Sequence, residues 1–101
     1  MESLKPLVEI ANQLCSLEKK IVKDPNSATY MRHLLRIKQS LEDLGITYHN
    51  PEGEKYTDSR TDIEATLTGE ISENMFISEV IKPIVIHNKQ IVQSGIVIVG
   101  S

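Results

Sequence analysis

The sequence predicts an α+β protein in which an N-terminal helical hairpin precedes a small all-β domain. In the first half, apolar residues recur at the three-and-four spacing of amphipathic helices. The tail from Glu79 to Val99 is instead rich in Ile and Val and is interrupted by turn residues, a composition typical of strands. We therefore expect residues 1–46 to form a helical region and residues 47–101 a compact β domain.

The first expected helix extends from Ser3 to about Lys23. Ser3 as a cap and Pro6 in the first turn suit a helix start, and the residue before Pro25 resists helical geometry. The helix is therefore expected to end near Val22 or Lys23. Its apolar face is wide and consists of Leu4, Leu7, Val8, Ala11, Leu14, Cys15, Leu17, Ile21 and Val22.

The second expected helix begins at about residue 25 or 28 and ends at Leu44. Either Asp24 or Ser27 is expected to cap it, and Gly45 followed by an apolar residue is typical of a left-handed helix stop. The apolar positions of this helix are spaced four, three, four and three, which is a two-heptad seam. They are Tyr30, Leu34, Ile37, Leu41 and Leu44.

Two amphipathic helices joined by a short break must bury their apolar faces. A dimeric four-helix bundle made from two copies of the hairpin achieves this, with the seam of the second helix as the dimer interface. On this interpretation residues 1–46 are the dimerisation region. The alternative is that the β domain of the same chain covers the helices.

The first part of the β domain is predicted to be a polar segment followed by two strands. Thr47 to Arg60 is polar and contains turn chemistry. Ile63 to Leu67 alternates apolar and polar residues, which predicts a half-buried strand. A loop at Glu73-Asn74 and a strand from Phe76 to Ile81 follow.

The tail then predicts a β-hairpin. Ile84 to Ile86 forms one arm, the turn lies at Asn88, and Gln90 to Val99 forms the other arm. Pro83 implies an edge position or a bulge because it has no backbone N–H to donate. Gly95 within the second arm suggests a bulge or a bend.

Composition limits the class of protein. The longest apolar runs fall far short of the roughly 20 residues that span a bilayer, so we expect no membrane segment. The single Cys15 excludes an intrachain disulfide and, with no apolar signal segment after Met1, predicts a cytoplasmic protein.

Charge is unevenly distributed between the two halves. Residues 1–45 carry seven Lys or Arg against six Asp or Glu, whereas residues 46–101 carry four against eight. The absence of a basic stripe or an aromatic platform argues against nucleic-acid binding. A partner of the acidic half is expected to present basic groups.

No pattern for catalysis or for a cofactor stands out. His33, His49 and His87 lie in three separate segments without further ligands at metal-binding spacing. The acidic residues between Glu52 and Glu64 lack the pattern of a calcium loop, and we interpret them as a solvated face. Cys15 lies on an apolar helix face, which favours a structural thiol. We therefore expect a binding protein with no metal or cofactor rather than an enzyme.

Several segments resemble the GrpE family of nucleotide exchange factors. LKPLVE at residues 4–9 matches an L-x-P-[LIV]-[LIV]-[DE] pattern, and LEDLGI at residues 41–46 matches the end of that family's second helix. Gly53 and Tyr56 agree with the next element, and the register then continues without a gap through residue 99. The matches in the tail are Glu79-Val80-Ile81, Asn88, Ile91-Val92, Gly95, Val97 and Val99.

The resemblance implies a dimeric cochaperone for a DnaK-type ATPase. In that family the helices form a four-helix bundle, and each β domain inserts into the chaperone's nucleotide-binding domain and favours its open, nucleotide-free state. A partner that binds one conformer more tightly shifts the equilibrium toward that conformer. The partner-contact residues that the resemblance implies are Lys82, Asn88, Lys89, Gln90, Gln93 and Val99.

The chain departs from the family pattern at several positions. The long N-terminal coiled coil is absent, Ile84-Val85 replace Gly-Tyr, Thr61-Asp62 replace His-Glu, and Gln90 and Gln93 stand where arginines are common. Without these arginines the surface lacks two bidentate donors that are frequent at interfaces. The alternative interpretation is therefore a structural or adaptor dimerisation module that keeps the fold and has lost exchange activity.

Overall fold

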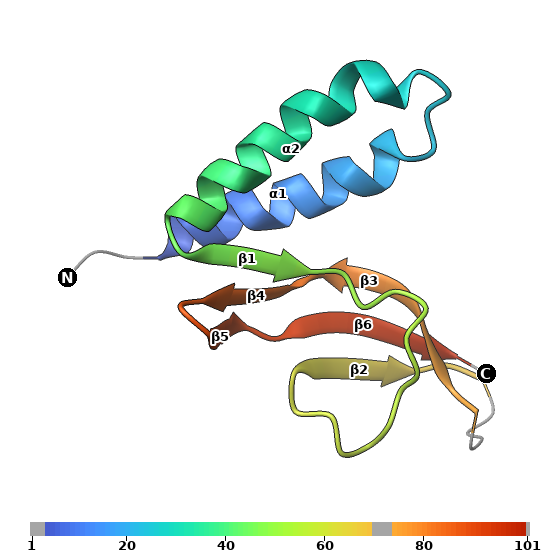
Figure 1. Cartoon of the computed structure of the whole chain (residues 1–101). Helices are drawn as coiled ribbons and strands as arrows, with labels where there is room; N and C mark the ends of the chain where they lie inside the picture. The colour runs from blue at the N-terminus through green and yellow to red at the C-terminus, as the bar shows by residue number, and fades with distance from the viewer. Residues whose placement is uncertain (1–3, 70–73, 101) are drawn as a thin grey trace.

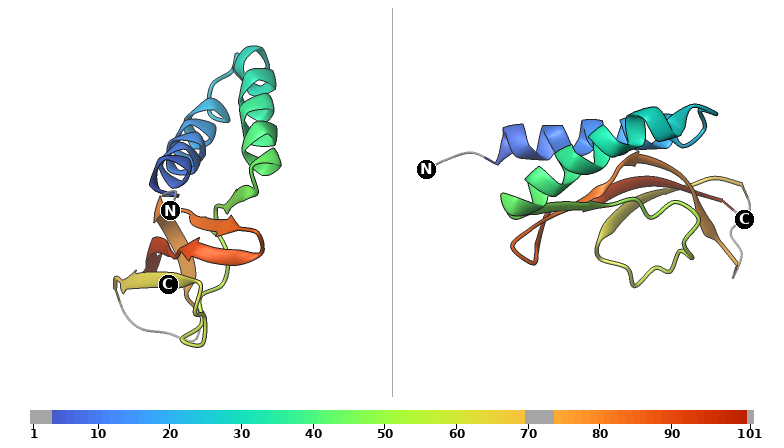
Figure 2. Two further views of the ribbon diagram at one scale, coloured as in Figure 1. Left: turned by 90° about the vertical axis from the view of Figure 1, so that its left-hand side faces the viewer. Right: turned by 45° about the horizontal axis from the view of Figure 1, so that its top comes forward.

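The computed structural model describes residues 4–69 and 74–100 and has the α+β organisation expected from the sequence. The helical hairpin consists of α1 (Lys5–Ile21) and α2 (Ser27–Asp43). The strands that follow are β1 (Ile46–His49), β2 (Ile63–Leu67), β3 (Phe76–Lys82), β4 (Ile84–His87), β5 (Gln90–Gln93) and β6 (Gly95–Gly100). The helices lie on one side of β1, and β2 lies farthest from them (Figures 1 and 2).

The strands form two three-stranded sheets. The first has the order β1-β4-β5 and is antiparallel throughout. The second has the order β2-β6-β3, in which β6 pairs parallel with β2 and antiparallel with β3. The chain therefore passes between sheets twice in its last third, once between β3 and β4 and once between β5 and β6.

The helix boundaries agree with the sequence to within about two residues, but the expected caps are not formed. Asn26 occupies the N-cap position of α2 without a side-chain bond, while Asp24 Oδ1 accepts a hydrogen bond from the Asn26 N–H at 2.8 Å. The cap expected at Ser3 lies outside the described residues. The helix stop at Gly45 is confirmed, because this glycine has φ +85° and its N–H donates to Glu42 O at 2.8 Å.

β1 lies mostly within a segment that was expected to be polar, Thr47 to Arg60. Ile46 and Tyr48 point toward the helices, whereas Thr47 and His49 are exposed. This is the period-2 pattern of a strand with one buried face, but it lasts for only four residues. Pairing with β4 and packing under the helices stabilise a strand that is too short to be recognised from its own sequence.

The expected long hairpin in the tail is also corrected. β4 and β5 form a short hairpin around Asn88 and Lys89, and β6 then leaves for the other sheet. Gly95 marks this passage, since a Cβ there would lie 3.0 Å from Ile84 Cγ1 and 3.3 Å from Ile63 Cγ2. Pro83 is buried between β3 and β4, at the other crossing.

Two hydrophobic clusters form the core, and β4 contributes to both. One is composed of Ile63, Met75, Ile77, Val80, Ile84, Val97 and Val99. The other joins the helices to the first sheet and is composed of Ala11, Leu14, Leu34, Leu41, Ile46 and Val85. One apolar face of the hairpin is thus covered by the chain's own sheet. This is the alternative that the sequence left open, and it accounts for part of the apolar surface of the helices.

Neither α1 nor α2 is long and apolar enough to cross a membrane.

Candidate functional site

The histidines and the cysteine lie apart from one another. His33 lines a groove between the helices, His49 contacts Glu54, and His87 contacts Asn88. Burial raises the pKa of the Cys15 thiol, which favours its unreactive form. Among residues 4–69 and 74–100, no three His, Cys, Asp or Glu side chains are placed to hold a metal ion.

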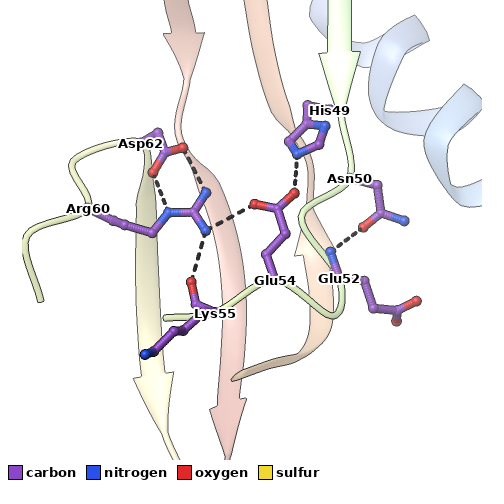
Figure 3. Close-up of polar contacts among 7 residues, drawn as sticks. All are labelled: His49, Asn50, Glu52, Glu54, Lys55, Arg60 and Asp62. Carbon is purple, nitrogen blue, oxygen red and sulfur yellow. Dashed lines mark hydrogen bonds and ion pairs between the residues drawn. The ribbon is translucent and has the colours of Figure 1, made fainter. Parts of the chain in front are cut away.

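A polar network closes the loop between β1 and β2. Arg60 lies between two carboxylates, as Figure 3 shows: its Nε and Nη2 donate to Asp62 at 3.0 and 2.9 Å, and its Nη1 donates to Glu54 at 3.1 Å. Glu54 also contacts His49 at the end of β1, and Arg60 Nη1 donates to Lys55 O at 3.4 Å. Bidentate pairing of this kind fixes the loop, so we interpret the network as structural.

Because of this network, the stability of the fold is expected to depend on pH. The hydrogen bonds and the charge of Arg60 lower the pKa of Asp62 below its ordinary value. A carboxylate with a lowered pKa stabilises the fold above its unfolded pKa, and this contribution disappears as the pH falls through the folded pKa. Asp62→Asn should therefore cost roughly 1 kcal/mol at pH 7, because the pair is partly exposed, and should approach zero cost in the acid range. Urea unfolding of both proteins from pH 7 to pH 3 measures this convergence; a cost independent of pH would contradict it.

A second polar cluster joins β1 to both helices. The Tyr48 hydroxyl donates to Glu18 Oε1 at 2.7 Å, and Lys38 Nζ lies 3.6 Å from the same oxygen and 4.7 Å from the centre of the Tyr48 ring. Burial, together with the hydrogen bond to Glu18, raises the pKa of Tyr48, so the phenol remains a donor at neutral pH. Lys19 Nζ adds a bond to Val80 O at 2.8 Å.

The two helices form an open groove of about 440 Å³. Its lining is mainly apolar and consists of Leu17, Lys20, Ile21, Asp24, Tyr30, His33, Leu34 and Ile37. Of the five residues expected at a dimer interface, Tyr30, Ile37 and Leu44 are exposed. Leu34 and Leu41 are instead buried in the cluster that joins the helices to the first sheet.

The residues expected to contact a partner do not form one surface. Asn88 and Lys89 make the turn of the β4–β5 hairpin with φ +49° and +71°, and Gln90 is exposed beside them. Asn88 N–H donates to Gly45 O at 3.1 Å, which holds the turn against the end of α2. Lys82 is exposed at the end of β3.

Two of the expected partner residues face inward. Val99 is 0% exposed, and its side chain lies in the core of the second sheet. Gln93 is partly buried, and its amide bonds to Asn12 and to Pro83 O. The alternation of β6 places Val99 on the same face as Val97, which is also in the core.

Two exposed apolar residues of β5, Ile91 and Val92, match the family pattern but are not among the expected partner contacts. Ile91 is 49% exposed and Val92 is 40% exposed, beside Lys89 and Gln90. Val85 pairs with Gln93 and Ile86 pairs with Ile91, so β5 has one more residue than β4 between these two pairs. Val92 is this extra residue and forms a β-bulge. Exposed apolar side chains beside polar ones are common at protein contact surfaces. No local sequence signal separates these residues from core Ile and Val.

The described residues thus offer two surfaces for other proteins. One is the helical groove, and the other is the surface of Lys89, Gln90, Ile91 and Val92, which we call the β5 surface. Comparisons of the chain with family models, with curated proteins and with solved structures find no match.

Proposed function

We propose that the chain is a GrpE-like cochaperone that acts as a dimeric nucleotide exchange factor for a DnaK-type chaperone ATPase. The observation that carries the proposal is the register of family-like residues from Gly53 to Val99, which runs without a gap. The order of a helical hairpin followed by a small β module, with an exposed β5 surface, supports it.

The proposed dimer is a four-helix bundle in which a second copy covers the helical groove. Supporting it are the exposed side chains of Tyr30 and Ile37, which lie on the groove side of a hairpin whose other face is already covered. Lys20 and Asp24 lie at the same groove and bear opposite charges. In a two-fold arrangement each surface meets itself, so opposite charges can pair across the interface.

The proposed β5 contact would act by binding one state of the chaperone. A partner shifts a conformational equilibrium only by its differential affinity for the two states. If the β5 surface binds the open, nucleotide-free state more tightly, release of nucleotide becomes faster. Ile91 and Val92 supply the apolar contact, and Lys89 supplies a charge that can select the orientation of binding.

Release of a fluorescent nucleotide from a preloaded DnaK-type ATPase of the same organism tests this function. A saturating concentration of the chain should accelerate release, and Lys89→Glu should reduce the acceleration about tenfold, since charge reversal opposes the contact. Lys55→Glu makes the same charge change on an exposed loop residue and should release nucleotide like the wild type. Release at the basal rate with the wild-type chain would refute the proposed activity.

The second candidate is an adaptor that dimerises and has no exchange activity. The observation that favours it is the inward orientation of the Gln93 amide, together with Gln90 at the other position where the family commonly has arginine. A stable dimer that leaves nucleotide release at its basal rate would support the adaptor. Acceleration that is sensitive to Lys89→Glu would exclude it.

A further inference from the structure

We infer that Gln93 is a positioning residue whose side-chain amide latches β5 to α1 and to the crossing between the two sheets. The latch consists of Gln93, Asn12 and the carbonyl of Pro83. The latch first stabilises β5 within the fold, which does not depend on any partner. It also controls the direction in which the β5 surface points, and this second role rests on the function proposed above.

The side-chain amide of Gln93 both donates and accepts hydrogen bonds. Its Nε2 donates to Asn12 Oδ1 at 2.7 Å and to Pro83 O at 2.8 Å, and its Oε1 accepts from Asn12 Nδ2 at 3.2 Å. The two amides are thus joined reciprocally although they lie 81 positions apart in the chain. All three bonds are partly buried, where unpaired polar groups are costly.

Glutamine suits this position because the site needs two donors and one acceptor. An arginine offers donors only and could not accept from Asn12, and a glutamate offers acceptors only and could not donate to Pro83 O. The internal bonds thus give a physical reason for glutamine at position 93. The side chain acts on β5 from within the fold and does not need to touch a partner.

β5 is a strand that needs such support. It has four residues, it pairs with β4 alone among the described strands, and Val92 bulges out of the ladder. Short edge strands with bulges are held weakly by their own ladder bonds. The latch adds three bonds at the end of β5, directly before the chain crosses to β6.

Amide hydrogen exchange of the intact chain tests the structural step. Gln93→Glu keeps the size of the side chain but places a carboxylate oxygen against Pro83 O, so the β5 amides should exchange about tenfold faster while those in the middle of α1 keep their rates. Asn12→Asp keeps the acceptor for one N–H of Gln93 and leaves the bond to Pro83 O, but it loses the donor to Gln93 Oε1. It should therefore accelerate exchange of the β5 amides, but less than Gln93→Glu does.

Two comparisons separate the latch from a general effect of charge. Gln90→Glu introduces the same charge on the same strand at an exposed position and should leave β5 protection as in the wild type. Wild-type exchange rates in Gln93→Glu, or equal acceleration in Gln90→Glu, would overturn the latch. If Gln93→Glu unfolds the whole chain, Gln93→Met removes the bonds without adding a charge and gives the same comparison.

Nucleotide release tests the positioning step separately. If its dimer is intact, the Gln93→Glu variant at saturating concentration should accelerate nucleotide release several-fold less than the wild type does. A loosened β5 surface is in its binding-competent orientation for a smaller fraction of the time. Wild-type acceleration in this variant would overturn the positioning role. If the wild-type chain itself gives no acceleration, the proposed function fails, whereas the amide exchange rates still decide whether the latch exists.

Discussion

Leu34→Ala should lower the free energy of unfolding by about 2–5 kcal/mol. Leu34 is 2% exposed and packs with Ala11 of α1, Ile46 of β1 and Val85 of β4. Truncating it removes apolar contacts to both helices and to the first sheet and leaves a cavity that a close-packed interior fills only in part. Urea unfolding monitored by circular dichroism measures the loss.

The neighbouring Leu35 is a matched control for this prediction. It has the same side chain on the same helix but is 53% exposed. Leu35→Ala should change the free energy of unfolding by no more than about 0.5 kcal/mol. Equal costs at the two positions would contradict the assignment of Leu34 to the core shared by the helices and the sheet.

Ile37→Asp should convert the proposed dimer into a folded monomer. Ile37 is 47% exposed in the single chain, so aspartate is tolerated there by the monomer. In a four-helix bundle the same carboxylate would be buried in the groove without a partner, at a cost of several kcal/mol on each side of the interface. Light scattering coupled to size exclusion measures the mass, and circular dichroism checks that the helices remain.

Ala28→Asp provides the control for the dimer. Ala28 is exposed and lies nine residues before Ile37, which at 100° per residue places it on the opposite side of α2. This variant should keep the wild-type mass. A wild-type chain that is already monomeric at high concentration, or an unchanged dimer in Ile37→Asp, would refute the proposed bundle.

Local patterns predicted the helices well because their signals are local. The apolar spacing along α1 and α2, the break at Pro25 and the glycine with φ +85° at residue 45 depend on neighbours within a few positions. β2 and the start of β3 were predicted for the same reason. The four-residue β1 was missed because its alternation is too short to stand out from a polar segment.

Exposure was predicted less well, since it depends on which surfaces meet. Leu34, Ile37 and Leu41 belong to one seam in the sequence, yet the first and third are buried by the chain's own sheet and the second is exposed. Likewise Ile91 and Val97 are similar apolar residues of two strands that follow one another in the chain, but Ile91 is exposed on an edge strand and Val97 is buried in the core.

The sequence by itself determined the α+β class, the two helices and the presence of a β-rich tail, because periodicity and turn chemistry are encoded by near neighbours. Only the tertiary structure decided that β6 leaves the tail hairpin to pair with β2, that Val99 is buried, and that Gln93 bonds to Asn12. These outcomes depend on contacts between residues that are far apart in the chain. Such contacts form only where two surfaces are complementary in shape and in hydrogen bonding, and a local pattern does not contain that information.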